Sequence, residues 1–179
     1  MKYKLDVSLT EKDYYNFNKF HMSHSPYGKR NQRSAYIIAT VMALLIALMS
    51  LIIEGVTLTT MLMLFPYAIV IASMLALIKP LSLLILKIQI IVMKKRGKLP
   101  YSASSTLELY DDFFVEITET ERREVKYTGA EGIMVAEDGS VYIYMNSLMA
   151  YILPVGTFES DEVRDEIREF LLDKVAPLK

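Results

Sequence analysis

The chain lacks cysteine and tryptophan entirely and has only two histidines among its 179 residues. The absence of cysteine excludes disulfides, thiolate metal sites and cysteine nucleophiles. The nucleophile-elbow, zinc-protease, Walker and dinucleotide-binding motifs are also missing. The two histidines, His21 and His24, have no third histidine, cysteine or evident carboxylate partner with which to complete a metal site. The sequence therefore predicts no catalytic residue, no metal ligand and no cofactor.

Two carboxylate pairs, Asp111-Asp112 and Glu137-Asp138, are the other candidates for a polar site. Adjacent carboxylates can bind Ca²⁺ or act as general acid and base, but neither pair has the ligand periodicity of a calcium loop. Both pairs fall at expected turns, where aspartate is common. We interpret them as turn residues and expect a protein that is not an enzyme. A small membrane-associated enzyme is the alternative, with His21, Asp111, Asp112 and Asp138 as its candidate residues.

Charge is divided unevenly along the chain. Residues 1–100 carry 13 lysines and arginines against 4 aspartates and glutamates, a net charge of +9. Residues 101–179 carry 7 against 17, a net charge of −10. An acidic domain repels polyanions, so nucleic acid is not an expected partner. The negative charge of residues 101–179 is instead suited to binding a basic segment of another protein.

Two apolar runs without charged residues, Ala35–Ile53 and Thr59–Ile78, follow each other with Glu54 as the only charge between them. Each approaches the roughly 20 residues that a helix needs to cross the hydrocarbon core of a bilayer. The mostly polar stretch before the first run does not have the layout of a cleavable signal peptide. The sequence therefore predicts a two-span transmembrane hairpin over residues 35–78, with the lipid bilayer as its partner.

Basic residues flank this hairpin on both sides, whereas the loop between the two spans has none. The positive-inside rule then predicts a multi-pass protein of the cell membrane with both termini in the cytoplasm. Seven residues form the predicted lipid-interface collar: Lys29, Arg30, Arg33, Lys94, Lys95, Arg96 and Lys98. The collar either sets the topology alone or also binds anionic lipid. In the second case, each basic residue near the surface contributes about 1 kcal/mol of electrostatic attraction to the membrane.

Alanines recur at every fourth position in both apolar runs. The first run has Ala35, Ala39, Ala43 and Ala47, and the second has Ala68, Ala72 and Ala76. Small residues at this spacing let helix backbones approach closely in lipid. We expect the two stripes to pack the helices of one hairpin against each other, with homodimerisation as the second use.

Residues 79–100 form a juxtamembrane segment with an apolar stretch, Leu81–Met93, that is too short to span. Lys87 and Gln89 interrupt this stretch. We expect a helix that either lies in the cytoplasmic interface or continues the second span with a bend at Pro80. A third span is disfavoured, because it would bury Lys87 and carry the following basic cluster outside.

The remaining segments predict a small α+β domain. In residues 1–34, an alternating strand over Tyr3–Leu9 precedes a helix that Thr10 caps and that ends near Met22. In residues 101–179, short strands form an antiparallel sheet, closed by a helix from Ser160 to about Val175. The predicted strands are Thr106–Tyr110, Phe113–Ile117, Glu121–Tyr127, Ile133–Ala136, Val141–Met145 and Leu148–Leu153.

The N-terminal strand has an apolar face but no partner before the first span. A lone strand is not stable in water, and an exposed strand edge favours aggregation. We therefore expect this strand to join the C-terminal sheet, so that the membrane hairpin is an insertion in a discontinuous domain. The following helix would then either pack beside the domain or bridge it to the membrane interface through Tyr14, Phe17 and Phe20.

Three features together resemble the YcxB-like family of bacterial membrane proteins. They are the segment Asp13–Met22 (DYYNFNKFHM), the two-span hairpin, and a C-terminal run from Val141-Tyr142-Ile143-Tyr144 through Ile152-Leu153-Pro154 to Phe158 and an acidic helix. The resemblance implies a bacterial inner-membrane protein with a domain similar to pleckstrin-homology-like folds, a half-open sheet capped by a helix. It implies no reaction, because the shared motifs are structural. Val155-Gly156-Thr157 stands where the family often has a basic residue.

Overall fold

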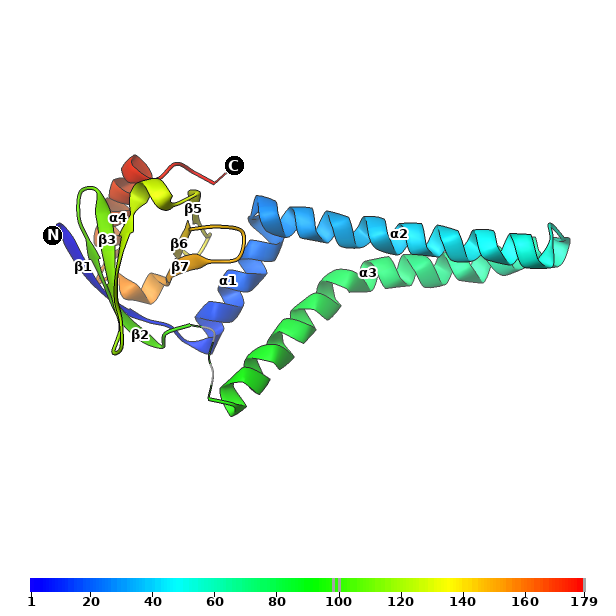
Figure 1. Cartoon of the computed structure of the whole chain (residues 1–179), viewed down its shortest axis with the longest axis horizontal. Helices are drawn as coiled ribbons and strands as arrows, with labels where there is room; N and C mark the ends of the chain where they lie inside the picture. Colours follow the sequence, from blue (N-terminus) through cyan, green and yellow to red (C-terminus); the bar gives the residue numbers. More distant parts are fainter. Residues whose placement is uncertain (98, 100, 179) are drawn as a thin grey trace.

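Two small sheets lie at one end of the molecule, and two long helices extend from them to the other end (Figure 1). The computed structural model describes residues 1–97, 99 and 101–178, without the side chains of residues 63 and 64. Its elements are β1 (Tyr3–Ser8), α1 (Glu11–His24), α2 (Pro26–Glu54), α3 (Leu58–Lys95), β2 (Ser104–Leu109), β3 (Phe113–Ile117), β4 (Arg122–Lys126), β5 (Gly132–Val135), β6 (Val141–Tyr144), β7 (Ala150–Leu153) and α4 (Asp161–Lys174), with short 3-10 turns at Tyr127–Gly129 (η1) and Val155–Thr157 (η2).

The N-terminal strand belongs to the C-terminal sheet. β1 pairs antiparallel with β2 over its whole length, from Tyr3 opposite Leu109 to Ser8 opposite Ser104. The sheet has the order β1-β2-β3-β4. Leu5 and Val7 are only 6% and 5% exposed, because the apolar face of β1 points into the domain core. This pairing is the one expected from the alternation of β1, and residues 9–103 lie between the two paired strands.

The strands form two sheets, where the sequence analysis expected one. β5, β6 and β7 make a separate antiparallel sheet in that order. The chain leaves β4 through the turn η1 before it enters β5, so the two strands do not pair. The main core lies between the two sheets and α4, and includes Leu109, Phe114, Ile143 and Leu171. The two sheets thus pack on one hydrophobic core, although no strand of one sheet is hydrogen-bonded to a strand of the other.

Helix α1 covers the outer face of the second sheet. Tyr142 and Tyr144 of β6 point away from the main core and are nevertheless almost completely buried. Phe17 of α1 lies edge-on to the Tyr142 ring at 5.0 Å between centroids, and Phe20 packs against the same ring at 5.2 Å. The packing expected for Tyr14, Phe17 and Phe20 is therefore confirmed, since all three join this second cluster.

Helices α2 and α3 are both long and apolar enough to cross a membrane. Thr57 begins α3 with a capping box to Thr60. The helix continues without interruption to Lys95, although it contains Pro66 and Pro80. It bends in the part of the chain that contains Pro80 (Figure 1), because proline removes a backbone hydrogen bond and clashes with the preceding turn. Of the two alternatives for residues 81–93, the continuous, bent helix is observed.

The alanine stripes behave differently on the two helices. Ala39, Ala43 and Ala47 of α2 are half-buried, as expected for residues that face α3. The second stripe does not pack within the hairpin as expected, because its members are exposed: Ala68, Ala72 and Ala76. Larger residues of α3, Ile71 and Leu75, are half-buried instead. A shallow groove of small residues on one helix accommodates large side chains from the other, so a second small stripe is not needed. Homodimerisation, the second use expected for these stripes, stays a prediction.

Candidate binding cleft and basic helix ends

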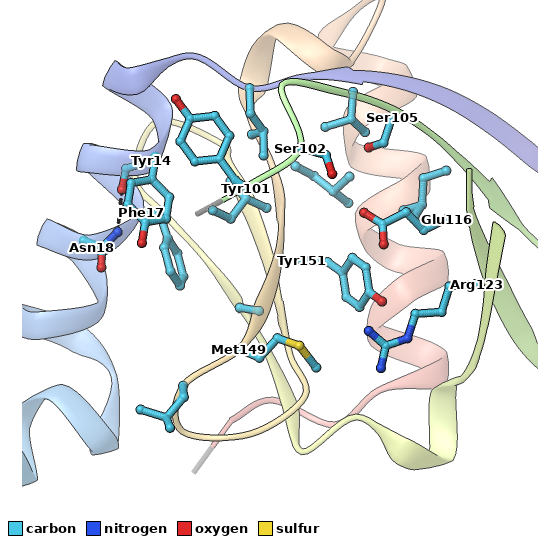
Figure 2. Close-up of a pocket in the computed structure, with 17 residues that line it drawn as sticks. Tyr14, Phe17, Asn18, Tyr101, Ser102, Ser105, Glu116, Arg123, Met149 and Tyr151 are labelled. Carbon is cyan, nitrogen blue, oxygen red and sulfur yellow. Dashed lines mark hydrogen bonds between the residues drawn. The ribbon is translucent and has the colours of Figure 1, made fainter. Parts of the chain in front are cut away.

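A cleft of about 250 Å³ lies where the two sheets separate, between β1, β2, β7 and the first turns of α1 (Figure 2). Its charged side chains come from β3 and β4 of the first sheet, whereas β1, β2, β7, the loop before β7 and α1 supply apolar and uncharged polar ones. The lining residues that carry charge or aromatic rings are Tyr14, Phe17, Tyr101, Glu116, Arg123 and Tyr151. The cleft thus combines a few polar groups with apolar walls, as small ligand and peptide sites commonly do.

The register of the first sheet explains why its inner face becomes polar at the cleft. At one end, Phe114 stands opposite both Leu109 and Val125, and all three are buried in the core. Two residues further along β3, Glu116 stands opposite Arg123 on the same face. Because strand residues alternate between faces, this step of two reaches a row that is apolar on β1 and β2, at Leu5 and Leu107, and charged on β3 and β4. The inner face of the sheet therefore changes from apolar to charged within this row.

Glu116, Arg123 and Tyr151 point into the same space in Figure 2. Burial raises the pKa of the half-buried Glu116 carboxyl, and the nearby Arg123 guanidinium partly offsets this effect. Burial also raises the pKa of the Tyr151 phenol, which therefore stays protonated at neutral pH. A partly desolvated carboxylate attracts a cation more strongly than one in free solution. No ion pair within 4.0 Å joins Glu116 to Arg123 in the described chain, so the carboxylate at the inner end of the cleft remains available to a further cation.

Aromatic and apolar side chains form the mouth of the cleft. The rings of Tyr14 and Tyr101 are stacked with centroids 5.0 Å apart. Across from them, the loop between β6 and β7 presents Met149 to the cleft, and the neighbouring Leu148 is 94% exposed. An apolar side chain so exposed at the mouth of an apolar cleft marks a surface suited to contact with another molecule.

Two of the strands that border the cleft, β1 and β7, are edge strands. In the described part of the chain, β1 pairs only with β2, and β7 pairs only with β6. Each strand therefore has a second edge with main-chain groups that no strand of the chain uses. Edge strands of this kind can accept an additional strand from a partner.

His21 lies in a polar joint between α1, α2 and β6. Its Nδ1 atom is 3.1 Å from Ser25 Oγ and 3.3 Å from Tyr144 Oη. Burial lowers the pKa of His21 and raises that of Tyr144, so both side chains favour their uncharged forms. His24 stacks on Phe20 instead. No group of three histidine, aspartate or glutamate side chains with metal-binding spacing occurs among the described residues.

The sequence analysis missed Ser25 and Gly28, which shape this joint. Ser25 is fully buried, donates to the carbonyl oxygen of His21 at 2.7 Å, and accepts from the Gly28 amide at 2.9 Å. A Cβ atom on Gly28 would lie 2.0 Å from the carbonyl oxygen of His21. The first turn of α2 can approach α1 so closely only because position 28 has no side chain. The run Ser25-Pro26-Tyr27-Gly28 has the composition of a break between helices, but composition does not reveal this contact.

The carboxylate pairs lie in turns, as their positions indicated. Asp111 is in the turn between β2 and β3 and forms an ion pair with Lys2 at 3.3 Å. Asp138 is in the turn between β5 and β6, where its Oδ1 accepts from the Ser140 amide at 3.0 Å. Gly139 follows with a φ of 87°, a conformation that favours glycine. Neither Asp111 nor Asp138 lines the cleft.

The predicted basic collar divides into two groups at opposite ends of α1. Lys29, Arg30 and Arg33 lie in the first turns of α2, which follow the C-terminal end of α1. The other group lies at the end of α3, where Lys94 forms an ion pair with Glu11 in the first turn of α1. It includes Lys94, Lys95 and Arg96, while Lys98 lies outside the described residues. Sequence order alone could not indicate that α1 separates the two groups.

Comparisons with known proteins found no similar protein. A scan against protein-family models, a search of curated proteins and a search of solved structures each gave no match. The functional argument therefore depends on the geometry of the cleft and of the helix ends.

Proposed function

We propose that the chain is an integral membrane protein of the YcxB-like type, in which α2 and the first part of α3 span the bilayer. The large apolar side chains along both helices are exposed, which suits contact with lipid rather than water. The loop between the two helices lies at the far end of the molecule from the sheets and contains no lysine or arginine (Figure 1). Both termini are then cytoplasmic, in the inner membrane of a bacterium.

The distribution of charge over the folded chain supports this orientation. Lys29, Arg30 and Arg33 lie near the start of α2, and Lys94 and Lys95 lie in the last turn of α3, at the helix ends nearest to the sheets. The acidic helix α4 lies on the side of the sheet domain away from α2 and α3 (Figure 1). The negative surface potential of the cytoplasmic leaflet attracts the basic groups and repels the acidic ones. The domain is accordingly held with its basic side toward the bilayer.

We further propose that the sheet domain is a binding module of the pleckstrin-homology-like type. Sheets of four and three strands, joined at the core and closed by α4, suit the half-open arrangement implied by the family resemblance. A fold of this type does not define a ligand by itself. The function must therefore come from the cleft.

The cleft captures an extended, basic segment of a partner protein. The observation that carries this function is that two edge strands, β1 and β7, border a cleft with Glu116 at its inner end. Main-chain hydrogen bonds to a free edge supply affinity without regard to sequence, and the cleft supplies specificity through side chains. Glu116 pairs with a lysine or arginine of the segment. The protein is thus a membrane tether for a partner rather than an enzyme.

Photocrosslinking in intact membranes tests this function. A benzoylphenylalanine at Met149, which lines the cleft, should crosslink to a partner protein, and high salt should weaken the capture. The matched control is the same group at Glu124, an exposed position of β4 that does not line the cleft. The substitution Ser105→Trp, which fills the cleft, should abolish the crosslink in a protein that is still folded. Equal crosslinking from both positions, or a crosslink that Ser105→Trp leaves intact, would exclude the cleft as the binding site.

A further inference from the structure

A second concave surface lies between the first turn of α1 and the last turns of α3. This space of about 370 Å³ is lined by Glu11, Lys12 and Tyr15 from α1 and by Lys87, Ile90 and Ile91 from α3. We call it the α1–α3 pocket. Its two walls are about 75 residues apart in the sequence, and the sequence analysis assigned no role to Lys12 or Tyr15.

Two positive charges of the α1–α3 pocket are left without a partner. Glu11 already forms an ion pair with Lys94, which links α1 to the end of α3. In the described part of the chain, neither Lys12 nor Lys87 has a carboxylate oxygen within 4.0 Å. Both lysines are exposed and line the same space from different helices. An anion that enters this space therefore meets two unpaired ammonium groups.

Beside Lys87, the α3 wall of the pocket is apolar, and this apolar surface continues along α3. Ile90 is only 4% exposed, whereas Ile91 beside it remains accessible. Ile88 and Leu84, one and two helical turns before Ile91, are also exposed. Together they form an apolar strip on the same side of α3 as Lys87. A ligand that is anionic at one end and apolar along the rest matches both parts of this surface.

We propose that the α1–α3 pocket binds the phosphate headgroup of an anionic phospholipid of the cytoplasmic leaflet. Lys12 and Lys87 hold the phosphodiester, Tyr15 contacts the headgroup, and the acyl chains lie along Ile91, Ile88 and Leu84. This site depends on the proposed membrane location of α2 and α3, but not on capture of a protein in the cleft. Since α1 also covers the outer face of the second sheet, a lipid in the pocket fixes the orientation of the sheet domain at the bilayer.

Lipid retention by the full-length protein tests the site. The protein is released from nanodiscs that contain phosphatidylglycerol and phosphatidylcholine, and bound lipid is measured by native mass spectrometry. Lys12→Gln with Lys87→Gln should weaken retention of phosphatidylglycerol by about twenty-five-fold, at roughly fivefold for each lysine. Retention of phosphatidylcholine should not change. Because both side chains are exposed, neither substitution is expected to unfold the chain.

Two control variants separate the pocket from general charge attraction. Lys4→Gln with Lys126→Gln removes the same charge from the first sheet and should leave retention within twofold of the native chain. Lys12→Arg with Lys87→Arg should preserve binding. The site is wrong if the glutamine pair retains phosphatidylglycerol like the native chain, or if the control pair loses it equally. Competition by soluble glycerol phosphate at equal concentration would show a phosphate site without lipid selectivity. Release of the native chain from membranes by carbonate would instead contradict the proposed membrane location.

Discussion

The sheet domain and the helical hairpin use the same apolar residue types in opposite ways. In the sheets, Leu109, Phe114 and Ile143 are completely buried against one another. In the helices, Ile52 and Phe65 are 69% and 70% exposed. The domain therefore supplies its own apolar surroundings, whereas the hairpin needs them from outside. A protein built in this way has two sources of stability, and α1 is where they meet.

Helix α1 connects the two regions physically. On one side it covers Tyr142 and Tyr144 of the second sheet, and at its end it meets α2 across Ser25 and Gly28. A sheet with both faces buried depends on whatever covers its outer face. The soluble domain should therefore not behave as a unit independent of the first 24 residues.

The largest expected effect is on a fragment that contains only residues 101–179. This fragment lacks β1, and with it the buried Leu5 and Val7 and a complete ladder to β2. It also leaves the outer face of the second sheet uncovered. We expect it to unfold without cooperativity, whereas fusion of residues 1–24 to its N-terminus restores a cooperative transition. Chemical denaturation followed by circular dichroism checks this expectation. Equal cooperativity and stability of the two fragments would mean that β1 and α1 do not support the domain.

The next effect compares two residues on the outer faces of the two sheets. Tyr144→Ala removes a buried aromatic ring beneath α1 and should destabilise the protein by about 3–5 kcal/mol. Glu124→Ala, on the exposed face of β4, should change stability by less than about 0.5 kcal/mol. Tyr144→Phe retains the packing and loses only the hydroxyl near His21, so it should fall between the two. Thermal unfolding in detergent measures all three, and a small loss for Tyr144→Ala would show that α1 covers the sheet only loosely.

A smaller effect concerns the hairpin. Ala43→Leu adds bulk where α2 packs against α3 and should cost about 1–3 kcal/mol. Ala72→Leu should be close to neutral, because Ala72 is exposed and points away from α2. Stability of the two variants in the same detergent gives the comparison. If Ala72→Leu proves as harmful as Ala43→Leu, the outward stripe of α3 is itself an interface, and a homodimer is the first explanation to test.

Strong local patterns made most of the fold predictable. The alternation of Tyr3–Leu9 indicated β1, and its lack of a local partner indicated its pairing with the C-terminal sheet. The division into two sheets was missed, because strand patterns do not reveal which neighbours pair across a turn such as η1. The outward direction of Ala72 was missed for a related reason: spacing identifies a stripe but not the partner that it faces.

The candidate sites were much less predictable than the fold. Glu116 and Arg123 belong to strands with ordinary composition, and only the register of β3 and β4 places them opposite each other at the end of the core. Lys12 and Lys87 come together because α3 bends back toward α1. Contacts of this kind arise from tertiary packing of distant segments. Periodicity within one segment contains no information about them.

The smallest expected effect is a pH dependence at the point where domain and hairpin meet. Burial beside Tyr144 and Ser25 lowers the pKa of His21 in the folded protein below its value in the unfolded chain. In the pH range between these two pKa values, the unfolded chain binds more protons, so stability rises with pH. Acidification below about pH 6.5 should therefore destabilise the native protein, until the folded-state pKa is passed and the slope vanishes.

His21→Gln removes this titration while keeping a polar side chain at the joint. The variant should be less stable than the native chain at pH 7.5, because its packing against Phe17 and Tyr144 is altered. Between pH 7.5 and 5.5, however, it should lose less stability than the native chain does. Thermal midpoints in detergent across this range provide the measurement, with His24→Gln as the control because His24 is exposed. Parallel pH profiles for the native chain and His21→Gln would mean that His21 stays solvated, and that α1 does not hold the joint closed around it.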